Sequence, residues 1–421
     1  MPRSCVAYLC FSAMFSGVVV PGNGFTLSSL PLRGTGPIVQ RSSTVQPHGI
    51  HRLPLQTASA RKEHVSVKMG LASNALTSLA SVGALSMPVN PVVVLAGACI
   101  LAMSVAAFLL NKPSRAYQAG ENTVGKEYDA WTEEGILEYY WGEHIHLGFY
   151  NKSDIQNIKN PIKSSAVFKE TKYKFIDEMY KWSGAEAGGN KPLKVLDVGC
   201  GIGGTSRYLA KKLGGDTKVT GITLSPNQVQ RATELAKEKG LDNVEFKVMD
   251  ALKMEFPDNT FDLVWGCESG EHMPDKYKYV EEMTRVLKPG GTLVIATWCQ
   301  RETPPEFTES EKDKLKFLYE EWAHPYFISI EEYERHCKKT GKLEAISGAN
   351  WVKETIHAWR HSIWVGIWDP WIVIWKGFTS KVGPWIWWKV IREIVTLERM
   401  HRAFDSGLMT YGMIRAKKQQ A

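Results

Sequence analysis

Residues 195–204, VLDVGCGIGG, place one acid and four glycines in a turn between a predicted strand and a predicted helix. Gly199, Gly201 and Gly204 satisfy the spacing G-x-G-x-x-G, with Gly203 beside them. Glycines at such a turn let the backbone approach a ligand that lies on a helix N-terminus. The spacing fits a dinucleotide site or an S-adenosylmethionine (SAM) site, and a purely structural turn is the third interpretation.

Asp197 separates these interpretations. It stands two residues before the first glycine, where a carboxylate would repel a pyrophosphate but would suit the amino-acid and sulfonium groups of SAM. A dinucleotide site also requires an acid near the end of the second strand, for the ribose. The second predicted strand, KVTGITLS (218–225), ends without an acid. The sequence therefore favours SAM as the cofactor.

The ends of the next strands supply further cofactor contacts. Asp250 and Ala251 follow the third predicted strand, where the carboxylate and neighbouring amides can bind an adenine amino group. A helix N-cap is the alternative role for Asp250. By the same position at a strand end, Thr223, Leu224 and Gln228 are expected over the ribose.

The loop WGCESGEHMPDK (265–276) follows the fourth predicted strand, where substrates meet cofactors in open α/β sheets. It brings Glu268, Glu271 and His272 together, and carboxylates or an imidazole at this place can act as general bases. The alternative is that Glu271 and His272 are only structural loop and cap residues. No H-E-x-x-H pattern is present, and no metal site is predicted.

An aromatic segment, YYWGEHIHLGFY (139–150), precedes the predicted core. With five aromatic rings and few charges, it either packs on the core or folds over the cofactor as a lid. The aromatic faces of Tyr and Trp also suit a sulfonium cation. In the lid interpretation the cofactor site is lined by Tyr128, Tyr140, Trp141, Gly142, His144 and His146.

These residues need an alternating scaffold to position them. Strands are predicted near 194–198, 218–223, 244–249, 261–266 and 291–298, with helices between them. This is the parallel, doubly wound α/β pattern. LKPGG (287–291) marks a turn into the fifth strand, and two more strands are predicted near 343–349 and 407–416. Helical stretches are expected around 127–140 and 164–182.

A Trp-rich insertion separates the last two predicted strands and holds nine of the fifteen tryptophans. Trp364, Trp368, Trp371 and Trp375 form a helical stripe that Pro370 must interrupt or restart. Core packing is the ordinary meaning of such a stripe. Because Trp beside Lys also favours a bilayer interface, we interpret the insertion as a membrane-facing substrate entrance. The interleaved basic residues are Lys376, Lys381, Lys389 and Arg392.

The N-terminal region has the composition of a targeting sequence. Residues 1–120 contain nine Lys or Arg and one acid, so the rest of the chain is nearly neutral and has no nucleic-acid footprint. Residues 1–68 fit a signal plus a plastid transit-like leader, with an ordinary secretory signal as the alternative. Residues 69–112 then form an apolar linker and a membrane anchor (92–110), for which a buried helix or a second cleaved signal are the alternatives.

Seven cysteines without paired spacing fit a reducing compartment, such as the plastid stroma, better than the cell exterior. The remaining organisation is a lid region (113–190), a cofactor-binding core (191–300) and a substrate-side insertion with the final strands (301–421).

Several motifs resemble the γ-tocopherol methyltransferase-like family over about residues 93–418. They are YDAWTEEGILEYYWGEHIHLGFY (128–150), VLDVGCGIGG, GITLSPNQVQRA (221–232), ESGEHMPDK (268–276) and WKGFTS (375–380). ILEYYWGEHIHLG, WAHPYFISIE (322–331) and YGMIRAKK (411–418) look most like the cyanobacterial and algal methyl-phytyl-benzoquinol type. ESGEHMPDK and WKGFTS look more like the γ-tocopherol enzymes, since the benzoquinol type tends to carry Pro where this chain has Glu271. Leu147, in contrast, stands where the tocopherol enzymes usually have His.

The resemblance implies a Rossmann-like, seven-stranded class I SAM-methyltransferase fold with a helical lid. The family's SAM-binding positions carry over onto Asp197, Gly199, Gly201, Thr223, Asp250 and Ala251. The implied reaction is methyl transfer to a ring carbon of a prenylated phenol or quinol in tocopherol (vitamin E) and plastoquinone biosynthesis. Glu268 or Glu271 would act as base or orienter, with His272, His144 or His146 contacting the hydroxyl.

The implied setting is a plastid (chloroplast) membrane, envelope or thylakoid, with the catalytic part facing the stroma. The expected partners are a small prenylated quinol or phenol and the membrane, without nucleic acid or metal. γ-Tocopherol methylation is the nearest alternative activity. A small-amine N-methyltransferase on the same fold and a non-catalytic lipid-binding protein are more distant ones.

Overall fold

The computed structural model describes residues 90–118, 121–185, 193–380 and 383–420. The predicted leader (1–68), residues 69–89 of the predicted linker, and Lys381 lie outside these ranges.

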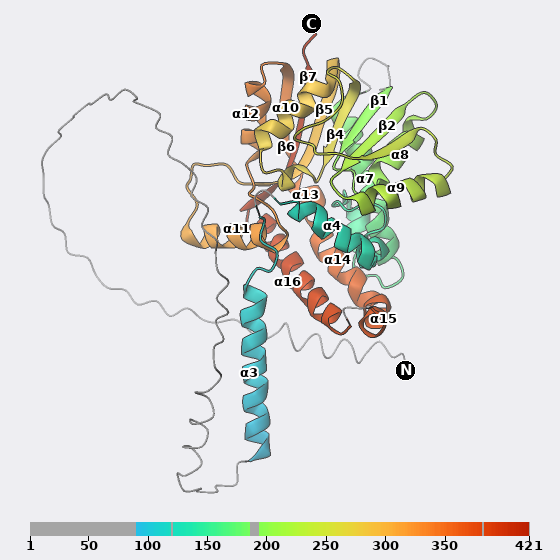
Figure 1. The fold of residues 1–421 in the computed structure, drawn as a ribbon. Helices are drawn as coiled ribbons and strands as arrows, with labels where there is room; N and C mark the ends of the chain where they lie inside the picture. The colour runs from blue at the N-terminus through green and yellow to red at the C-terminus, as the bar shows by residue number, and fades with distance from the viewer. Residues whose placement is uncertain (1–89, 119–120, 186–192, 381–382, 421) are drawn as a thin grey trace, which may run out of the picture. The chain divides into compact units, whose positions relative to one another are not determined.

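A seven-stranded sheet in the order β3-β2-β1-β4-β5-β7-β6 forms the centre of the domain (Figure 1). The first five strands are parallel, whereas β7 runs antiparallel to both β5 and β6. This confirms the predicted Rossmann-like α/β class. The strands are β1 (Lys194–Val198), β2 (Lys218–Thr223), β3 (Val244–Val248), β4 (Phe261–Cys267), β5 (Leu287–Gln300), β6 (Leu343–Asn350) and β7 (Met409–Lys418).

Strand β5 starts earlier than the sequence indicates. We expected LKPGG to be a turn before a strand at 291, but Leu287 already pairs with Phe261 of β4. The register shifts before the next pair, Leu263 with Thr292, and Gly290 has a positive φ of 75°. The glycine-proline segment is therefore an irregularity within the strand and not a separate turn.

Side chains of successive strand residues enter two hydrophobic cores, because they alternate between the faces of the sheet. On β1, Val195 packs into the core beneath α7 (Ser164–Ser183) and α8 (Gly204–Leu213). Its neighbour Leu196 packs on the other face, with α10 (Lys276–Val286) and α12 (Ile330–Lys339). Helix α9 (Pro226–Glu238) contacts β2 and β3. The remaining elements before the insertion are η1 (Gly270–His272) and α11 (Glu309–Glu321).

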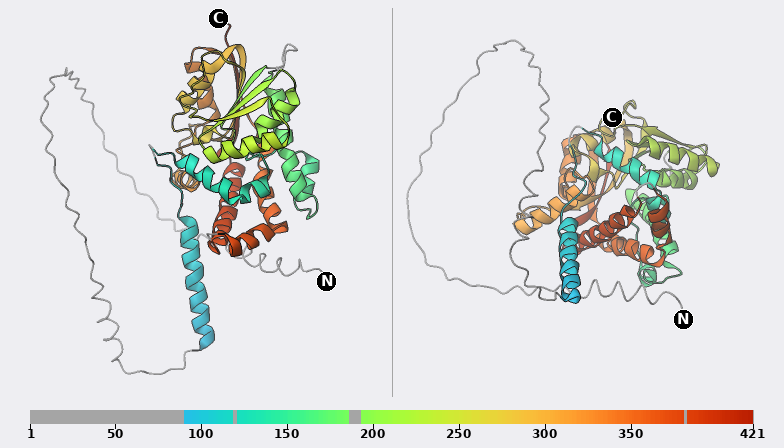
Figure 2. Two further views of the ribbon diagram at one scale, coloured as in Figure 1. Left: turned by 45° about the vertical axis from the view of Figure 1, so that its right-hand side comes forward. Right: turned by 60° about the horizontal axis from the view of Figure 1, so that its bottom comes forward.

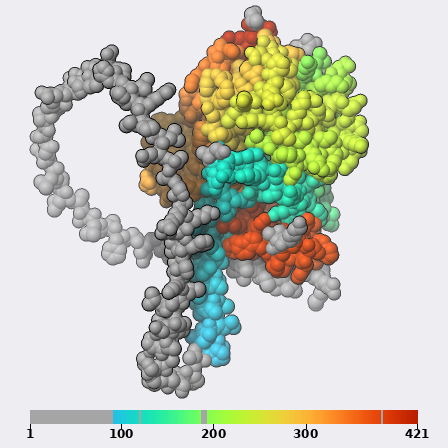
Figure 3. Space-filling model, in the orientation of Figure 1, coloured from blue at the N-terminus to red at the C-terminus, as the bar shows by residue number. Residues whose placement is uncertain are grey.

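Two helices stand in place of the single one expected at 127–140. Helix α4 (Thr123–Glu134) ends where Gly135 adopts a left-handed conformation with φ of 66°, and α5 (Ile136–Trp141) begins there. This α4–α5 segment lies between the sheet domain and the Trp-rich insertion, as its teal atoms show (Figure 3). Helix α6 (Lys152–Asn157) follows before α7.

The insertion forms four helices between β6 and β7 (Figure 2). Pro370 ends one helix and starts the next, as predicted, because proline cannot continue the hydrogen-bond ladder of a helix interior. The helices are α13 (Val352–Thr355), α14 (His357–Trp368), α15 (Trp371–Thr379) and α16 (Trp385–Asp405).

Helix α3 (Pro91–Asn111) precedes the domain and buries none of its residues. By length and composition it is the one helix of the described residues that could cross a membrane. The helix has no polar face, and only its last turn contacts the domain, which does not fit the alternative of a buried soluble helix.

Candidate active site

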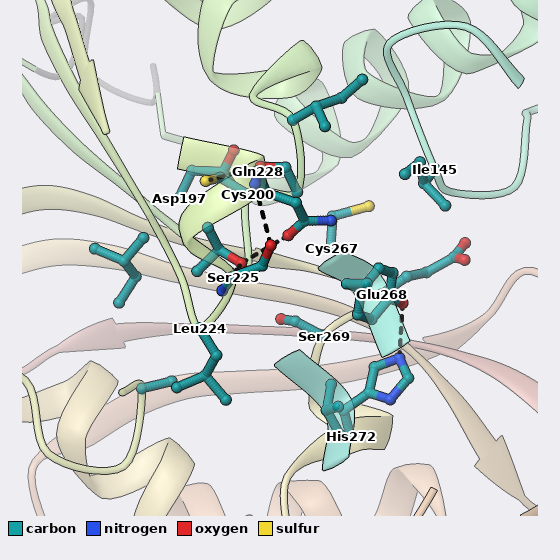
Figure 4. A pocket seen from close by; sticks show the side chains of 18 of the residues that line it. Ile145, Asp197, Cys200, Leu224, Ser225, Gln228, Cys267, Glu268, Ser269 and His272 are labelled. Atoms are coloured by element: carbon teal, nitrogen blue, oxygen red, sulfur yellow. Dashed lines mark hydrogen bonds between the residues drawn. The ribbon is translucent and has the colours of Figure 1, made fainter. Parts of the chain in front are cut away.

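A cavity of about 910 Å³, counted with its open mouth, lies at the carboxyl ends of β1, β2 and β4. Figure 4 shows Asp197, Cys200 and Gln228 on one side and Glu268 and His272 on the other. The structure thus brings most of the predicted residues to one place. The predicted residues that line it are Tyr128, His144, His146, Asp197, Gly199, Gly201, Thr223, Leu224, Gln228, Asp250, Ala251, Glu268 and His272.

The glycine turn closes the floor of this cavity. Gly199 has φ of 83°, and a Cβ there would lie 2.3 Å from the Cβ of Ser269. A Cβ on Gly204 would lie 2.0 Å from the backbone oxygen of Glu143, in residues 123–146, which are here called the lid segment. These distances require glycine at both positions. Gly203 caps α8 in a left-handed conformation and does not itself line the cavity.

Asp197 is buried at the end of β1, and the Ser206 hydroxyl donates to its Oδ2 over 2.6 Å. Burial raises the pKa of Asp197 to about 6, and the hydrogen bonds from Ser206 oppose that rise. A cation in the cavity would favour the ionised carboxylate. The α-ammonium and sulfonium groups of SAM fit this requirement.

Gln228 provides a second fit to SAM. Thr223 donates its hydroxyl to Gln228 Oε1 over 2.7 Å, which fixes the side-chain amide, while Gln228 Nε2 is buried without a hydrogen-bond partner. An unpaired amide donor at a cavity wall suits a carboxylate or a ribose hydroxyl. Asp250 lies farther out, and its Oδ1 accepts from the amide of Leu252 over 2.8 Å, so it caps a local turn and lines the cavity at once.

Glu268 is the most constrained acid at the cavity. Its φ of 49° is uncommon for a residue with a side chain. Both the amide of Leu147 and the hydroxyl of Tyr411 donate to its Oε1, each over 2.7 Å. Burial and the nearby charge of Glu271 raise the pKa of Glu268, while these hydrogen bonds lower it. Both of these bonds are made to Oε1, so Oε2 can take up a substrate proton.

Glu271 is placed differently, because it is buried behind the cavity and does not line it. The Thr297 hydroxyl donates to its Oε2 over 2.7 Å, and its Oε1 has no hydrogen-bond partner. Lys276 Nζ donates to the backbone oxygens of Gly270 and Glu271 and so holds the η1 turn. Burial raises the pKa of Glu271 as well.

His272 and Tyr128 form a pair over the cavity, with Tyr128 Oη and His272 Nε2 3.0 Å apart. The imidazole of His272 also stacks on that of His324, with ring centroids 4.4 Å apart. Burial lowers the pKa of His272 to about 3, so this imidazole is neutral at physiological pH. A neutral ring can accept or relay a proton.

The aromatic segment at 139–150 was predicted either to cover the cofactor as a lid or to pack on the core, and different residues of it do each. Glu143, His144, Ile145 and His146 line the cavity, as a lid would. His146 Nδ1 bonds to the oxygen of Leu147 over 2.8 Å, which leaves Nε2 without a proton and without a partner. Burial lowers the pKa of His146 to about 4.

Tyr140, Trp141 and Gly142 do not line the cavity. Trp141 packs edge-on against Phe168, and the buried Lys172 donates from Nζ to the Trp141 backbone oxygen over 2.8 Å. This half of the segment is therefore held in the core.

Polar contacts hold the lid segment against the cofactor half of the domain. Four of its acids point at α9 and the helix beside it. The pairs are Asp129 with Ser225, Glu133 with Asn227, Glu138 with Arg231, and Glu143 with Arg207 and Lys239. Most of these groups are partly exposed, so each contact contributes little free energy on its own.

On its other side the same segment is tied to the insertion. Lys376 donates to the backbone oxygen of Glu134 over 2.8 Å, and Lys389 pairs with the Glu134 carboxylate. The hydroxyls of Tyr139 and Tyr140 both bond to Asp369, each over 2.6 Å. The lid segment therefore bridges the cofactor site and the Trp-rich helices.

Sequence reasoning missed several residues of this site. Ser225 follows β2 and could have been found by the strand-end argument that gave Thr223. Ser269 lies within the predicted loop, and its hydroxyl donates to the oxygen of Val198 over 2.7 Å. Tyr411 comes from the last strand, far along the chain from Glu268, and no local pattern announces that contact. Among the described residues, no group of His, Cys, Asp and Glu could hold a metal ion.

Comparison with known proteins agrees with this geometry. A methyltransferase domain model matches residues 190–358. The 2-methyl-6-phytyl-1,4-hydroquinone methyltransferase of Synechocystis is 41% identical over 331 residues, covering 77% of this chain and 96% of that protein. The chloroplastic tocopherol O-methyltransferase of Arabidopsis thaliana is 36% identical over 290 residues, or 68% of this chain and 79% of that one.

Solved structures share the fold at low identity. The geranyl diphosphate C-methyltransferase of Streptomyces coelicolor aligns with a TM-score of 0.53 and 18% identity, over 73% of this chain and all of that one. The chain is a SAM-dependent methyltransferase and belongs to the family that contains the phytyl hydroquinone and tocopherol methyltransferases.

Proposed function

We propose that this enzyme methylates a ring carbon of a prenylated quinol of the methyl-phytyl-benzoquinol type, in tocopherol and plastoquinone biosynthesis. The observation that carries the proposal is Glu268, a half-buried carboxylate at the cavity wall whose Oε1 accepts two hydrogen bonds. The near full-length similarity to the Synechocystis hydroquinone enzyme supports the choice of acceptor.

SAM supplies an electrophilic methyl group when bound. A phenol ring carbon is a poor nucleophile, whereas the ring carbons of a phenolate are good ones. The role of Glu268 is to take the hydroxyl proton of the acceptor, since its raised pKa places it close to the pH at which it must work. Tyr128 and His272 orient that hydroxyl by hydrogen bonding.

A second proton must leave the methylated ring carbon before the ring regains its aromaticity. That proton is acidic, so a weakly basic neutral imidazole is sufficient to accept it. His146 Nε2, which lacks a proton and a partner at the cavity, is the group we assign to this step. Glu268 then returns the hydroxyl proton to the ring oxygen, so that one proton is released for each methyl group transferred.

Methylation of a chromanol, as in γ-tocopherol, is the second candidate. The loop ESGEHMPDK resembles those enzymes at Glu271, but Glu271 does not line the cavity and therefore does not contact the acceptor directly. A water-soluble amine would gain nothing from the exposed apolar helix α3. We further propose that α3 anchors the enzyme in a plastid membrane, envelope or thylakoid, with the catalytic domain in the stroma.

The decisive assay incubates the full-length enzyme with labelled SAM and three acceptors: methyl-phytyl-benzoquinol, γ-tocopherol and a small amine. The proposal requires label in the ring of the quinol at the highest kcat/KM. Label mainly in the chromanol would establish the second candidate. Transfer to the amine alone would refute both.

A further inference from the structure

Four large aromatic side chains lie exposed on the outer face of α15 and on the start of α16. Trp371, Trp375 and Phe378 follow each other at helical spacing and are 71%, 65% and 74% exposed. Trp385 at the start of α16 is 59% exposed. These four residues, here called the aromatic face, contrast with Trp364 and Trp368 of the same stripe, which stack at 5.7 Å and are half-buried.

The aromatic face is held outward by the way α15 packs on α16. A Cβ on Gly377 would lie 2.2 Å from the indole nitrogen of Trp387, so the helices meet at this glycine. The indole of Trp387 also donates to the oxygen of Val373 over 3.2 Å. Phe378 meets Trp387 of α16 edge-on, with ring centroids 5.6 Å apart, and the outer side chains of α15 otherwise stay largely exposed. Exposed apolar surface of this kind marks an interaction site.

Helix α3 joins the domain beside the same helices. Arg392 of α16 donates to the oxygens of Leu109 and Lys112, over 2.8 and 2.6 Å, at the last turn of α3. Arg399 donates to Asn111 over 2.7 Å. These arginines bind the carbonyl end of the helix, where cations are favoured.

An ion cluster stiffens this junction. The carboxylate of Glu321 is fully buried and pairs with Arg392 over 2.5 Å, and the amide of Ser114 also donates to it. Arg115 bonds to the backbone oxygen of Glu321 and pairs with Glu393 over 2.6 Å. The foot of α3 is thus fixed to α11 and α16. Figures 1 and 2 show α15 and the first turns of α16 at the end of the domain from which α3 extends.

We propose that the aromatic face of α15 and α16 rests in the interface of the lipid bilayer that α3 enters. The proposal rests on α3 being a membrane anchor. Trp and Phe are the residues that favour the headgroup boundary, and a fixed junction holds this face at the level where α3 leaves the membrane. The lysines first expected to reach lipid are otherwise engaged: Lys376 and Lys389 bind Glu134 of the lid segment.

The test compares the full chain with a triple variant, Trp371→Ser, Trp375→Ser and Trp385→Ser, in phosphatidylcholine–phosphatidylglycerol vesicles. Acyl chains brominated near the headgroups quench only tryptophans that touch lipid. We expect these lipids to quench part of the wild-type tryptophan emission, up to the fraction that three of the fifteen tryptophans contribute. The triple variant should lose this quenching. Val248→Ser, which removes an exposed side chain on β3, is the matched control and should quench like the wild type.

Flotation of the vesicles reports attachment through α3 separately, so a failed anchor and a failed aromatic face give different results. Binding of S-adenosylhomocysteine checks that each variant is folded. If the triple variant does not fold, the single variant Trp375→Ser takes its place. Equal quenching of wild type and variant on floating vesicles would overturn the proposal. A dimer in sedimentation that the triple variant breaks, without lipid quenching, would assign the face to a second copy instead and also overturn it.

Discussion

Tyr411→Phe tests the role of Glu268 without touching either substrate. The change removes a fully buried hydroxyl that donates to Glu268 Oε1 over 2.7 Å. A hydrogen bond to a charged group is worth about 1.5–3 kcal/mol. That bond favours the ionised carboxylate, so its loss raises the pKa of Glu268 above its already raised value.

The expected result follows from the conversion of about 1.4 kcal/mol per tenfold change. The acid limb of the kcat profile should move up by about one to two pH units, and the rate at neutral pH should fall roughly 10- to 100-fold. The plateau at high pH should recover, and the KM for SAM should stay unchanged. Methyl transfer from labelled SAM to methyl-phytyl-benzoquinol, followed across pH, measures all three.

Tyr319→Phe is the control, because its hydroxyl donates to Gln300 over 2.9 Å, outside the cavity. It should leave the profile in place. An acid limb that stays fixed in Tyr411→Phe, in a protein that still binds SAM, would refute Glu268 as the titrating base.

Further outcomes follow from the same geometry. Glu268→Gln should lower kcat by about 10²- to 10⁴-fold. Glu271→Gln, which changes a residue behind the cavity, should lower kcat much less and should move the acid limb of the kcat profile to lower pH. Full activity of both variants across the pH range would exclude a base in this loop. Gly204→Ala should abolish SAM binding in calorimetry, since its Cβ would lie 2.0 Å from the Glu143 oxygen. Ionising Asp197 in the folded protein is unfavourable without a cation, because burial raises its pKa to about 6. The stability of the free enzyme should therefore fall as the pH rises from about 3.9 to 6, and the increase in Tm caused by SAM should grow over the same range. An increase in Tm that stays constant across this range would contradict the prediction.

The fold was readable from the sequence where the signals are local. The apolar strands that contain Asp197 and Lys218 alternate with helices. Pro370 interrupts the Trp stripe because its ring leaves no amide hydrogen for a helix bond. Gly135 was missed because a single glycine within a helical pattern can be tolerated or can terminate the helix. The packing of α5 against Lys172 and α14 decides that the helix ends at Gly135.

The candidate site shows the same division. Residues at strand ends were predictable because parallel strands deliver their carboxyl ends to one edge. Tyr411 was not, since its contact with Glu268 depends on β7 inserting antiparallel between β5 and β6. The separate roles of Glu268 and Glu271 were also beyond the sequence, because they depend on the turn at η1 that buries one and exposes the other to the cavity.

The lid segment touches the cofactor half through Glu138 and Glu143, and it touches the insertion through Glu134 and Tyr139. Because one segment carries both sets of contacts, we expect the affinities for the two substrates to be thermodynamically coupled. By linkage, the factor by which a bound quinol tightens SAM equals the factor by which SAM tightens the quinol. S-Adenosylhomocysteine lacks the sulfonium charge, so we expect the quinol to change its affinity by a different factor.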